Sequence, residues 1–257
     1  MGLEKILRDM ISISEAVILM AGQGSRLRDS DNTFLKPLMP VLGRPLISYT
    51  LEALVSAGIE RVQVVVGYEM KRMIGQVEPL IPSGVTASFI ENHDWRKQNG
   101  ISVLTAASHV SAPFLLTMSD HIFDNAILDR LLGNFYPGLL NIAVDRKLDS
   151  IFDLDDAMKV QTRRNRITGI GKNLREYDAI DTGLFVCPLD IFEYLERAKS
   201  ESSRNDCSLA DGIRLMAGDN KVRAIDIREA WWQDVDTQQM LQSAERQMTE
   251  RLQETLR

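Results

Sequence analysis

Continuous apolar runs and helically spaced apolar residues alternate along the first part of the chain. Residues 16–21 (AVILMA) form an apolar run that ends in glycines, which is typical of a buried parallel strand. Apolar residues then recur at helical spacing over 45–57, and 62–67 form a second, β-branched run. This order of strand, Gly-rich loop, helix and strand predicts a βαβ unit, and therefore a parallel sheet with helices on both faces.

The same alternation continues to about residue 145, where the pattern changes. Before that point we predict strands at 85–91, 113–118 and 139–145, and helices at 101–110 and 125–134. Beyond it, short segments of alternating polarity predict antiparallel strands at 157–161, 167–170 and 181–187, with helices at 189–198, 209–217 and 237–255. We expect one α/β domain over 1–257 with a Rossmann-like mixed, mostly parallel sheet, an N-terminal extension at 1–14 that includes a short helical segment at 3–11, a small β-rich subregion at about 145–235, and a C-terminal helix at 237–255.

Charge and cysteine content exclude several classes of protein. The 257 residues include 30 Lys and Arg against 36 Asp and Glu, a net charge of −6, which argues against generic nucleic-acid binding. No stretch approaches the roughly 20 apolar residues that span a bilayer. Charged residues at positions 4 and 5 occupy the place of a signal peptide's apolar region, so export is not expected. The two cysteines, Cys187 and Cys207, predict reduced thiols in a cytoplasmic protein.

The loop after the first strand, residues 19–27 (LMAGQGSRL), carries two closely spaced glycines. A dinucleotide fingerprint would need a third glycine where Leu27 stands, and a Walker A sequence is absent. The remaining functional interpretation is a loop whose backbone N–H groups surround a triphosphate, with Arg26 beside it. On the glycines alone, a plain strand-to-helix turn is the favoured interpretation, because two closely spaced glycines are a weak signal.

The segment that follows, residues 36–47 (KPLMPVLGRPLI), changes that balance. Together with the loop it resembles the signature of the nucleoside triphosphate transferases that act on sugar phosphates and related alcohols. The resemblance implies that the nucleotide is held by Ala21, Gly22, Gly24 and Ser25. It also implies that Arg26 and Lys36 stabilise the reacting phosphates, where negative charge gathers on oxygen. A solvated surface lysine is the alternative for Lys36.

Asp120 follows a predicted buried strand, at the edge of the sheet where ligands bind in open α/β folds. It is therefore placed to bind a divalent metal. In the family that the sequence resembles, a second carboxylate completes this site, and Asp236 matches its position; Asp234 and a helix-capping role for Asp236 are the alternatives. Mg²⁺, which takes one or two carboxylates plus phosphate oxygens, is the expected cofactor. We interpret His121 as structural or ligand-adjacent, because an anionic phosphate nucleophile needs no base.

A narrower resemblance spans about residues 15–245. Five short motifs in this order are similar to those of the CTP:inositol-1-phosphate cytidylyltransferases: 99–102 (NGIS), 116–121 (LTMSDH), 170–178 (IGKNLREYD), 181–185 (DTGLF) and 232–237 (WQDVDT). In many members this enzyme is fused to a membrane-embedded alcohol phosphotransferase. This chain carries no apolar span, so we expect the free-standing form.

The narrower resemblance also assigns roles to individual residues. It implies that the base is contacted by Asn99, Gly100 and Ser102. It implies that Lys172 binds the acceptor phosphate in the 145–235 subregion, and that the hydroxyls of a polyol are contacted by Asp145, Glu176, Asp181 and Thr182. Helix capping by Asn99 and surface salt bridges of Asp145 and Glu176 are the alternatives.

These observations predict an Mg²⁺-dependent enzyme that joins CTP and inositol 1-phosphate to give CDP-inositol and pyrophosphate. The substrates are thus two small molecules, with no nucleic acid or membrane span, and a homodimer is left open. The alternatives are a cytidylyltransferase for another phospho- or phosphono-alcohol, such as phosphocholine or 2-aminoethylphosphonate, or a sugar-phosphate nucleotidyltransferase. From another class, a non-catalytic nucleotide-binding regulatory module stays open.

Overall fold

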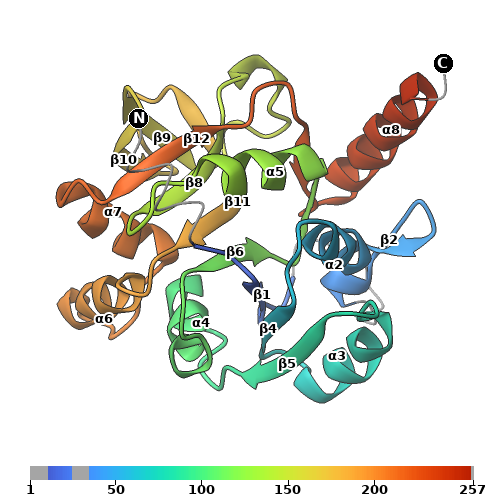
Figure 1. Ribbon diagram of the computed structural model, residues 1–257, viewed down its shortest axis with the longest axis horizontal. Coiled ribbons are helices and arrows are strands. Elements are labelled where there is room, and N and C mark those ends of the chain that lie inside the picture. Colours follow the sequence, from blue (N-terminus) through green and yellow to red (C-terminus); the bar gives the residue numbers. More distant parts are fainter. Residues whose placement is uncertain (1–10, 25–34, 256–257) are drawn as a thin grey trace.

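A mixed sheet of nine strands forms the centre of the computed structural model, which describes residues 11–24 and 35–255 (Figure 1). In spatial order the strands are β5 (Thr86–Glu91), β4 (Arg61–Val66), β1 (Glu15–Met20), β6 (Phe114–Met118), β11 (Ala179–Cys187), β8 (Leu140–Asp145), β12 (Val222–Asp226), β10 (Arg166–Gly171) and β9 (Lys159–Arg163).

The direction of the strands changes in the middle of the sheet. Strands β5, β4, β1 and β6 are parallel, as their apolar sequences predict. Strand β11 is antiparallel to both β6 and β8, and β9 and β10 add an antiparallel pair at the far edge. The predicted mixed α/β sheet is confirmed, and most of its antiparallel pairing involves strands beyond residue 145.

Helices cover both faces of the sheet because the side chains of each central strand alternate between two cores. In β1, Ala16 and Ile18 point into the core beneath α2 (Leu46–Ser56), α3 (Met70–Val77) and α5 (Asn125–Asn134). Val17 and Leu19 point into the opposite core, which is covered by α4 (Asn99–Thr105), α6 (Ile191–Glu201) and α7 (Leu209–Gly218). The continuous apolar sequence of β1 follows from this two-sided burial.

A third, smaller core joins segments that are far apart in the sequence. It packs α8 (Gln238–Thr255) against the hairpin of β2 (Pro40–Val41) and β3 (Arg44–Pro45) and against the antiparallel pair of β7 (His121–Phe123) and β13 (Trp232–Asp234). Its buried side chains include Val41, Ile122, Val235 and Leu241. Figure 1 shows α8 projecting from the body of the protein toward the C-terminus. This core places the segment after residue 35, the turn after β6 and the C-terminal segment next to one another.

The element predictions differ from the structure in a few places. The helix predicted at 101–110 begins at Asn99, ends at Thr105 and is followed by a 3₁₀ turn, Ala107–His109. Other 3₁₀ turns occur at Lys36–Leu38, Glu78–Leu80 and Leu148–Ser150. Helix α3 and the strands β2, β3, β7, β12 and β13 were not predicted. The helical segment predicted at 3–11 lies almost entirely outside the described residues.

Candidate active site

Two cavities lie at the carboxyl ends of β1 and β6 and share part of their walls. The small cavity, about 300 Å³, is lined by Leu19, Met20, Gly22, Gly24, Lys36, Pro37, Ser119, Asp120 and Asp236. The large cavity, about 590 Å³, extends toward β11, α8 and the segment after β8. Asp120 and Asp236 line both cavities, so these two carboxylates stand at the border between them.

The two glycines of the loop after β1 have different roles. Gly24 has φ +63°, and a Cβ atom placed on it would lie 2.7 Å from Cβ of Lys36. A Cβ atom on Gly22 would meet no atom of the described residues within 4 Å, so its backbone is open to the small cavity. Ala21 is buried, and its carbonyl accepts a hydrogen bond from the Tyr68 amide at 3.0 Å. Glycine at 24 thus allows the lysine to approach, while Gly22 leaves room for a ligand. The predicted contacts of Ser25 and Arg26 lie outside the described residues.

Lys36 lies between the side chains of Asp120 and Asp236. Its Nζ donates to Oδ2 of Asp120 at 2.5 Å and to Oδ1 of Asp236. Burial opposes the charge on Lys36, but the two carboxylates outweigh it and raise the pKa of the ammonium. Burial likewise disfavours the Asp120 carboxylate, yet Lys36 and His121 hold its pKa well below the usual range. Lys36 and Asp120 are therefore both charged near neutral pH.

Asp120 and Asp236 form a donor set that fits a divalent cation bound together with phosphates. Among the described residues there is no cluster of three or more His, Cys, Asp or Glu side chains arranged to hold a metal. Two carboxylates suffice for Mg²⁺, however, when phosphate oxygens and water complete its octahedron. The Lys36 ammonium between the carboxylates indicates that a cation is favoured at this point. The sequence predicted that Asp120 and Asp236 lie together, but it did not predict that Lys36 lies between them.

His121 is hydrogen-bonded to Asp120, one of the two proposed metal ligands. Its Nδ1 lies 2.7 Å from Oδ1 of Asp120, and its ring stacks on Trp232 with centroids 5.9 Å apart. Burial favours the neutral imidazole, but Asp120 outweighs it and raises the pKa of His121. This position agrees with the ligand-adjacent interpretation from the sequence.

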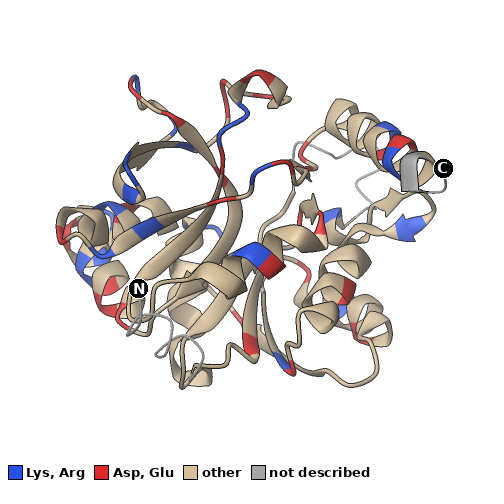
Figure 2. Ribbon diagram, turned by 45° about the horizontal axis from the view of Figure 1, so that its top comes forward, with Lys and Arg blue, Asp and Glu red and all other residues tan. Residues whose placement is uncertain are grey.

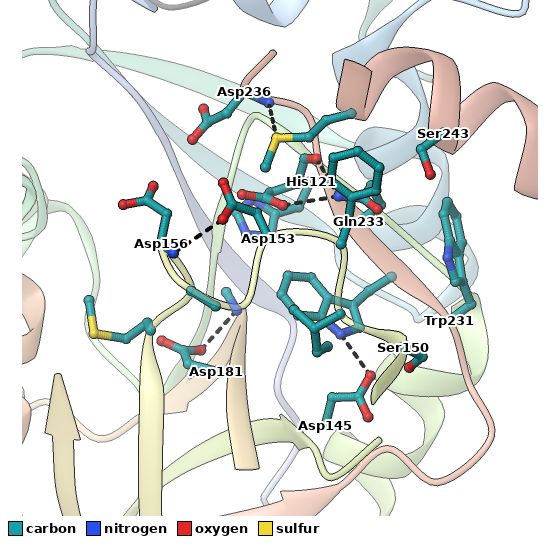
Figure 3. Close-up of a pocket in the computed structure, with 18 of the residues that line it drawn as sticks. His121, Asp145, Ser150, Asp153, Asp156, Asp181, Trp231, Gln233, Asp236 and Ser243 are labelled. Carbon is teal, nitrogen blue, oxygen red and sulfur yellow. Dashed lines mark hydrogen bonds between the residues drawn. The ribbon is translucent and has the colours of Figure 1, made fainter. Parts of the chain in front are cut away.

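The large cavity is lined by more carboxylates than cations. Figure 3 shows Asp145, Asp153, Asp156, Asp181 and Asp236 around it. Acidic and basic residues are interspersed along the ribbon as a whole (Figure 2), so the acidic excess is local to this cavity. The cationic side chains of the lining are Lys147, Lys172 and Arg251. Such a surface offers many acceptors to hydroxyl groups and a few sites for a phosphate.

Lys172, the predicted acceptor-phosphate ligand, lies on this lining. Its side chain is 48 % exposed, and Nζ donates to Asp156 Oδ1 at 2.5 Å. The buried Lys159 supports the same region, because its Nζ donates to the carbonyls of Asp155 and Lys172, both at 3.0 Å. The side chain of Lys172 is therefore accessible, while its backbone carbonyl is held in place by Lys159.

Asp181 is a second predicted residue on the lining. Its Oδ1 accepts from the Gly183 amide at 2.8 Å. Burial raises the pKa of its carboxyl to about 6, and the Gly183 amide and the nearby His121 oppose that rise only in part. Near neutral pH this carboxylate is ionised, and within the described part of the chain it forms no salt bridge, so a hydroxyl donor would stabilise it.

Three predicted acceptor contacts differ from expectation. Thr182 is fully buried, and its hydroxyl donates to the Ala143 carbonyl at 2.9 Å, because alternation along β11 turns it away from the cavity. Glu176 is exposed, accepts from Gln161 Nε2 at 3.3 Å and does not line the cavity. Asp145 lines the cavity, but both its oxygens already accept hydrogen bonds, from Lys147 and Trp232.

The predicted base contacts are mainly engaged within the protein. Asn99 lines the large cavity, and its Oδ1 accepts from the Leu209 amide at 2.9 Å. A Cβ atom on Gly100 would lie 2.5 Å from the Cys207 carbonyl, so glycine is required there by the packing of α4 against the start of α7. Ser102 is buried, and its hydroxyl accepts from Asn92 at 3.0 Å.

Two parts of the lining were missed by sequence reasoning. One is the segment after β8, which contributes Ser150, Phe152 and Asp153. The other is one face of α8, with Ser243, Gln247 and Arg251. For α8 the helical spacing of these polar residues, at intervals of four, was an available signal. The irregular segment had no such periodicity, although its acidic sequence DLDD at 153–156 was visible.

Comparison with known proteins identifies the family. The profile of the MobA-like NTP transferase domain matches residues 16–151, just over half of the chain. The chain belongs to the MobA-like NTP transferase family. The matched part of this MobA-like chain contains the small cavity's glycines, Lys36 and Asp120, whereas Lys172, Asp181 and Asp236 lie beyond it.

Longer similarities extend over the rest of the MobA-like chain. "Bifunctional IPC transferase and DIPP synthase" of Aquifex aeolicus is 32 % identical over 235 residues, and its namesake in Rubrobacter xylanophilus is 34 % identical over 236. These matches cover 91 % and 90 % of this chain but 51 % of each relative, so the chain spans about half the length of these relatives. A solved structure, the inositol-1-phosphate CTP transferase from T. maritima, superimposes with a TM-score of 0.79 and 28 % identity, over 90 % of this chain and 92 % of that one.

The similarity to that solved structure covers nine-tenths of both chains, so it extends well beyond the residues that the family profile matches. Within the part of the chain that the structure describes, no helix is both long and apolar enough to cross a membrane.

Proposed function

We propose that this chain transfers the cytidylyl group of CTP to inositol 1-phosphate, giving CDP-inositol and pyrophosphate, with Mg²⁺ as cofactor. One observation carries the proposal: Asp120 and Asp236 line both cavities, with Lys36 on the side of the small one. A reaction between two phosphorylated substrates needs such a shared border, where their phosphates meet. The similarity to the inositol-1-phosphate CTP transferase supports the choice of substrates.

The small cavity is suited to the triphosphate of CTP. Gly22 leaves its backbone open, and oriented amides with an adjacent ammonium bind phosphate oxygens well. Lys36 stabilises the negative charge that develops on these oxygens as the bond to pyrophosphate breaks. Catalysis then comes from placement and charge, without a covalent intermediate on the protein.

The large cavity is suited to a phosphorylated polyol. Lys172 is exposed on its lining and binds the acceptor phosphate, while Asp181 accepts hydrogen bonds from ring hydroxyls. An oxygen of the acceptor phosphate forms a bond to the α-phosphorus of CTP. The bond from that phosphorus to the β-phosphate oxygen breaks, and its electron pair leaves with pyrophosphate. The attacking oxygen is already anionic, so no residue has to remove a proton.

Asp120 and Asp236 would hold the Mg²⁺ ion. When bound, a divalent ion there neutralises charge on the triphosphate oxygens. Because Lys36 donates to both carboxylates, we infer that it transfers its hydrogen bonds from them to the phosphates as the nucleotide binds. Lys36 thus neutralises the carboxylates when the site is empty and the phosphates when the nucleotide is bound.

A cationic acceptor such as phosphocholine or 2-aminoethylphosphonate is the second candidate. The observation that favours it is the large cavity itself, where Trp231 and Trp232 accompany an excess of carboxylates. Aromatic faces and carboxylates bind ammonium groups. The amides and hydroxyls of Gln233 and Ser243 on the same lining suit a polyol better, which places inositol 1-phosphate first.

A panel of acceptors tests the assignment. Pyrophosphate release would be measured with CTP, Mg²⁺ and each of inositol 1-phosphate, glucose 1-phosphate, phosphocholine and 2-aminoethylphosphonate, with UTP as the alternative nucleotide. Mass spectrometry would identify the product. We expect the highest kcat/KM with CTP and inositol 1-phosphate, and an increase of KM for the acceptor in Lys172→Ala. Turnover with phosphocholine and none with inositol 1-phosphate would replace the first candidate by the second.

We also infer a reducing compartment, the cytoplasm, for this protein. The inference is supported by Cys187 and Cys207, which are both buried and unpaired thiols.

A further inference from the structure

The border between the two cavities continues into a chain of contacts that starts at β8. Asp145, the last residue of that strand, is 3 % exposed. Its Oδ1 accepts from the amide and from Nζ of Lys147, both at 2.8 Å. Its Oδ2 accepts from Nε1 of Trp232 at 3.0 Å. Both oxygens are thus engaged within the protein, and the carboxylate sets the position of the indole (Figure 3).

The Trp232 indole in turn packs against one face of the His121 ring. The β7–β13 ladder places His121 opposite Asp234, so Trp232, two residues earlier, lies diagonally on the same face. The two rings are nearly parallel, with an interplanar angle of 10°. On strand β11, a Cβ atom on Gly183 would lie 2.6 Å from Nε2 of His121. The imidazole therefore lies between an indole and a glycine backbone and has little freedom to rotate.

The imidazole then fixes the rotation of the Asp120 carboxylate. Nδ1 of His121 bonds Oδ1, while Oδ2 receives the hydrogen bond of Lys36. One oxygen is thus used for orientation, and the other faces the position between the two metal-site carboxylates. A histidine or carboxylate behind a metal ligand commonly restricts it in this way and raises the affinity for the metal.

We propose that Asp145, Trp232 and His121 are positioning residues that orient the Asp120 carboxylate toward the divalent cation. The inference rests on the proposed function only in assigning a cation to Asp120. It also links the two cavities, because Trp232 belongs to the lining of the acceptor side and acts through His121 on the nucleotide side. A purely structural network would stabilise the fold without changing metal binding.

The test measures Mn²⁺ binding to the full chain with CTP present, by the electron paramagnetic resonance signal of free Mn²⁺. His121→Phe keeps a ring but has no nitrogen, and we expect Mn²⁺ binding to weaken at least about tenfold. His121→Asn keeps a nitrogen donor near the place of Nδ1, and we expect it to restore binding to within about threefold of the unchanged chain. The exposed His109, which lies outside both cavities, provides His109→Phe as the matched control.

Trp232→Phe provides a second arm if His121→Phe does not fold. It keeps a stacking ring and removes the Nε1–H donor to Asp145, and we expect Mn²⁺ binding to weaken about threefold or more. Unchanged Mn²⁺ affinity in a folded His121→Phe or Trp232→Phe would overturn the proposal, as would equal losses in His121→Phe and His121→Asn. Because Mn²⁺ binding involves no acceptor, a chain that rejects inositol 1-phosphate would refute the proposed substrate while this series still decides the positioning role.

Discussion

Lys36 and Asp120 stand 84 positions apart in the sequence, yet Nζ of the lysine lies 2.5 Å from Oδ2 of the aspartate. The ammonium also donates to Asp236, so a protein cation occupies the position between two carboxylates that otherwise suits a metal ion. Lys36 and a divalent cation should therefore compete for the carboxylates of Asp120 and Asp236.

Replacing Lys36 by alanine should therefore have two opposite effects. Turnover should fall by about a hundredfold or more, the scale of a lost donor to developing negative charge. Without the lysine, Asp120 and Asp236 are left as facing carboxylates, so Mg²⁺ alone should raise the melting temperature more than in the unchanged chain. Differential scanning fluorimetry with Mg²⁺ and with EDTA checks this, and equal shifts in both proteins would contradict it.

Carboxylate substitutions should separate the two candidates for the second metal ligand. Asp236→Asn removes a charge that borders both cavities, whereas Asp234→Asn removes one that lines only the large cavity. We expect Asp120→Asn and Asp236→Asn to lower kcat about a hundredfold or more, and Asp234→Asn about tenfold or less. Pyrophosphate release at saturating CTP measures this. A larger loss in Asp234→Asn would exchange their roles.

Gly22 and Gly24 offer a matched pair of substitutions two positions apart. Alanine at 24 has to adopt φ +63° and would press on Lys36, whereas alanine at 22 contacts none of residues 11–24 and 35–255 within 4 Å. Gly24→Ala should thus lower the free energy of unfolding by about 1 kcal/mol or more and displace the lysine. Thermal unfolding and kcat/KM in both variants test this prediction, which fails if Gly22→Ala is the more damaged protein.

Asp181 should make stability depend on pH. Its carboxyl has a pKa of about 6 in the folded protein, above that of an unfolded aspartate. The folded state therefore binds the proton more tightly, and stability falls as pH rises from about 4 through the folded pKa. Asp181→Asn should gain up to about 3 kcal/mol relative to the unchanged chain over that interval and nothing further at higher pH. Chemical unfolding of both proteins across this range measures the difference.

Sequence patterns predict the sheet better than they predict the site. The apolar runs of β1 and β6 are continuous because both faces of the sheet are covered, and that signal is local. Asp120 and Asp236 were predicted as a pair from the resemblance, but the contact of Lys36 with both of them depends on the third core, which joins distant segments. Thr182 was misassigned because neighbouring residues of a strand face opposite sides of the sheet, so Thr182 points away from the cavity that Asp181 lines. Gly100 is explained by α7, which lies far along the sequence.

The hydrogen bond from Lys36 to Asp236 joins residues 200 positions apart. During synthesis on the ribosome, the turns that carry Lys36 and Asp120 emerge long before the segment that carries Asp236. The nascent chain can thus pair β1, β4, β5 and β6 while the proposed cation-binding corner still lacks its second carboxylate. That corner is completed only when β13 pairs with β7, so the first parallel strands appear well before the proposed metal site.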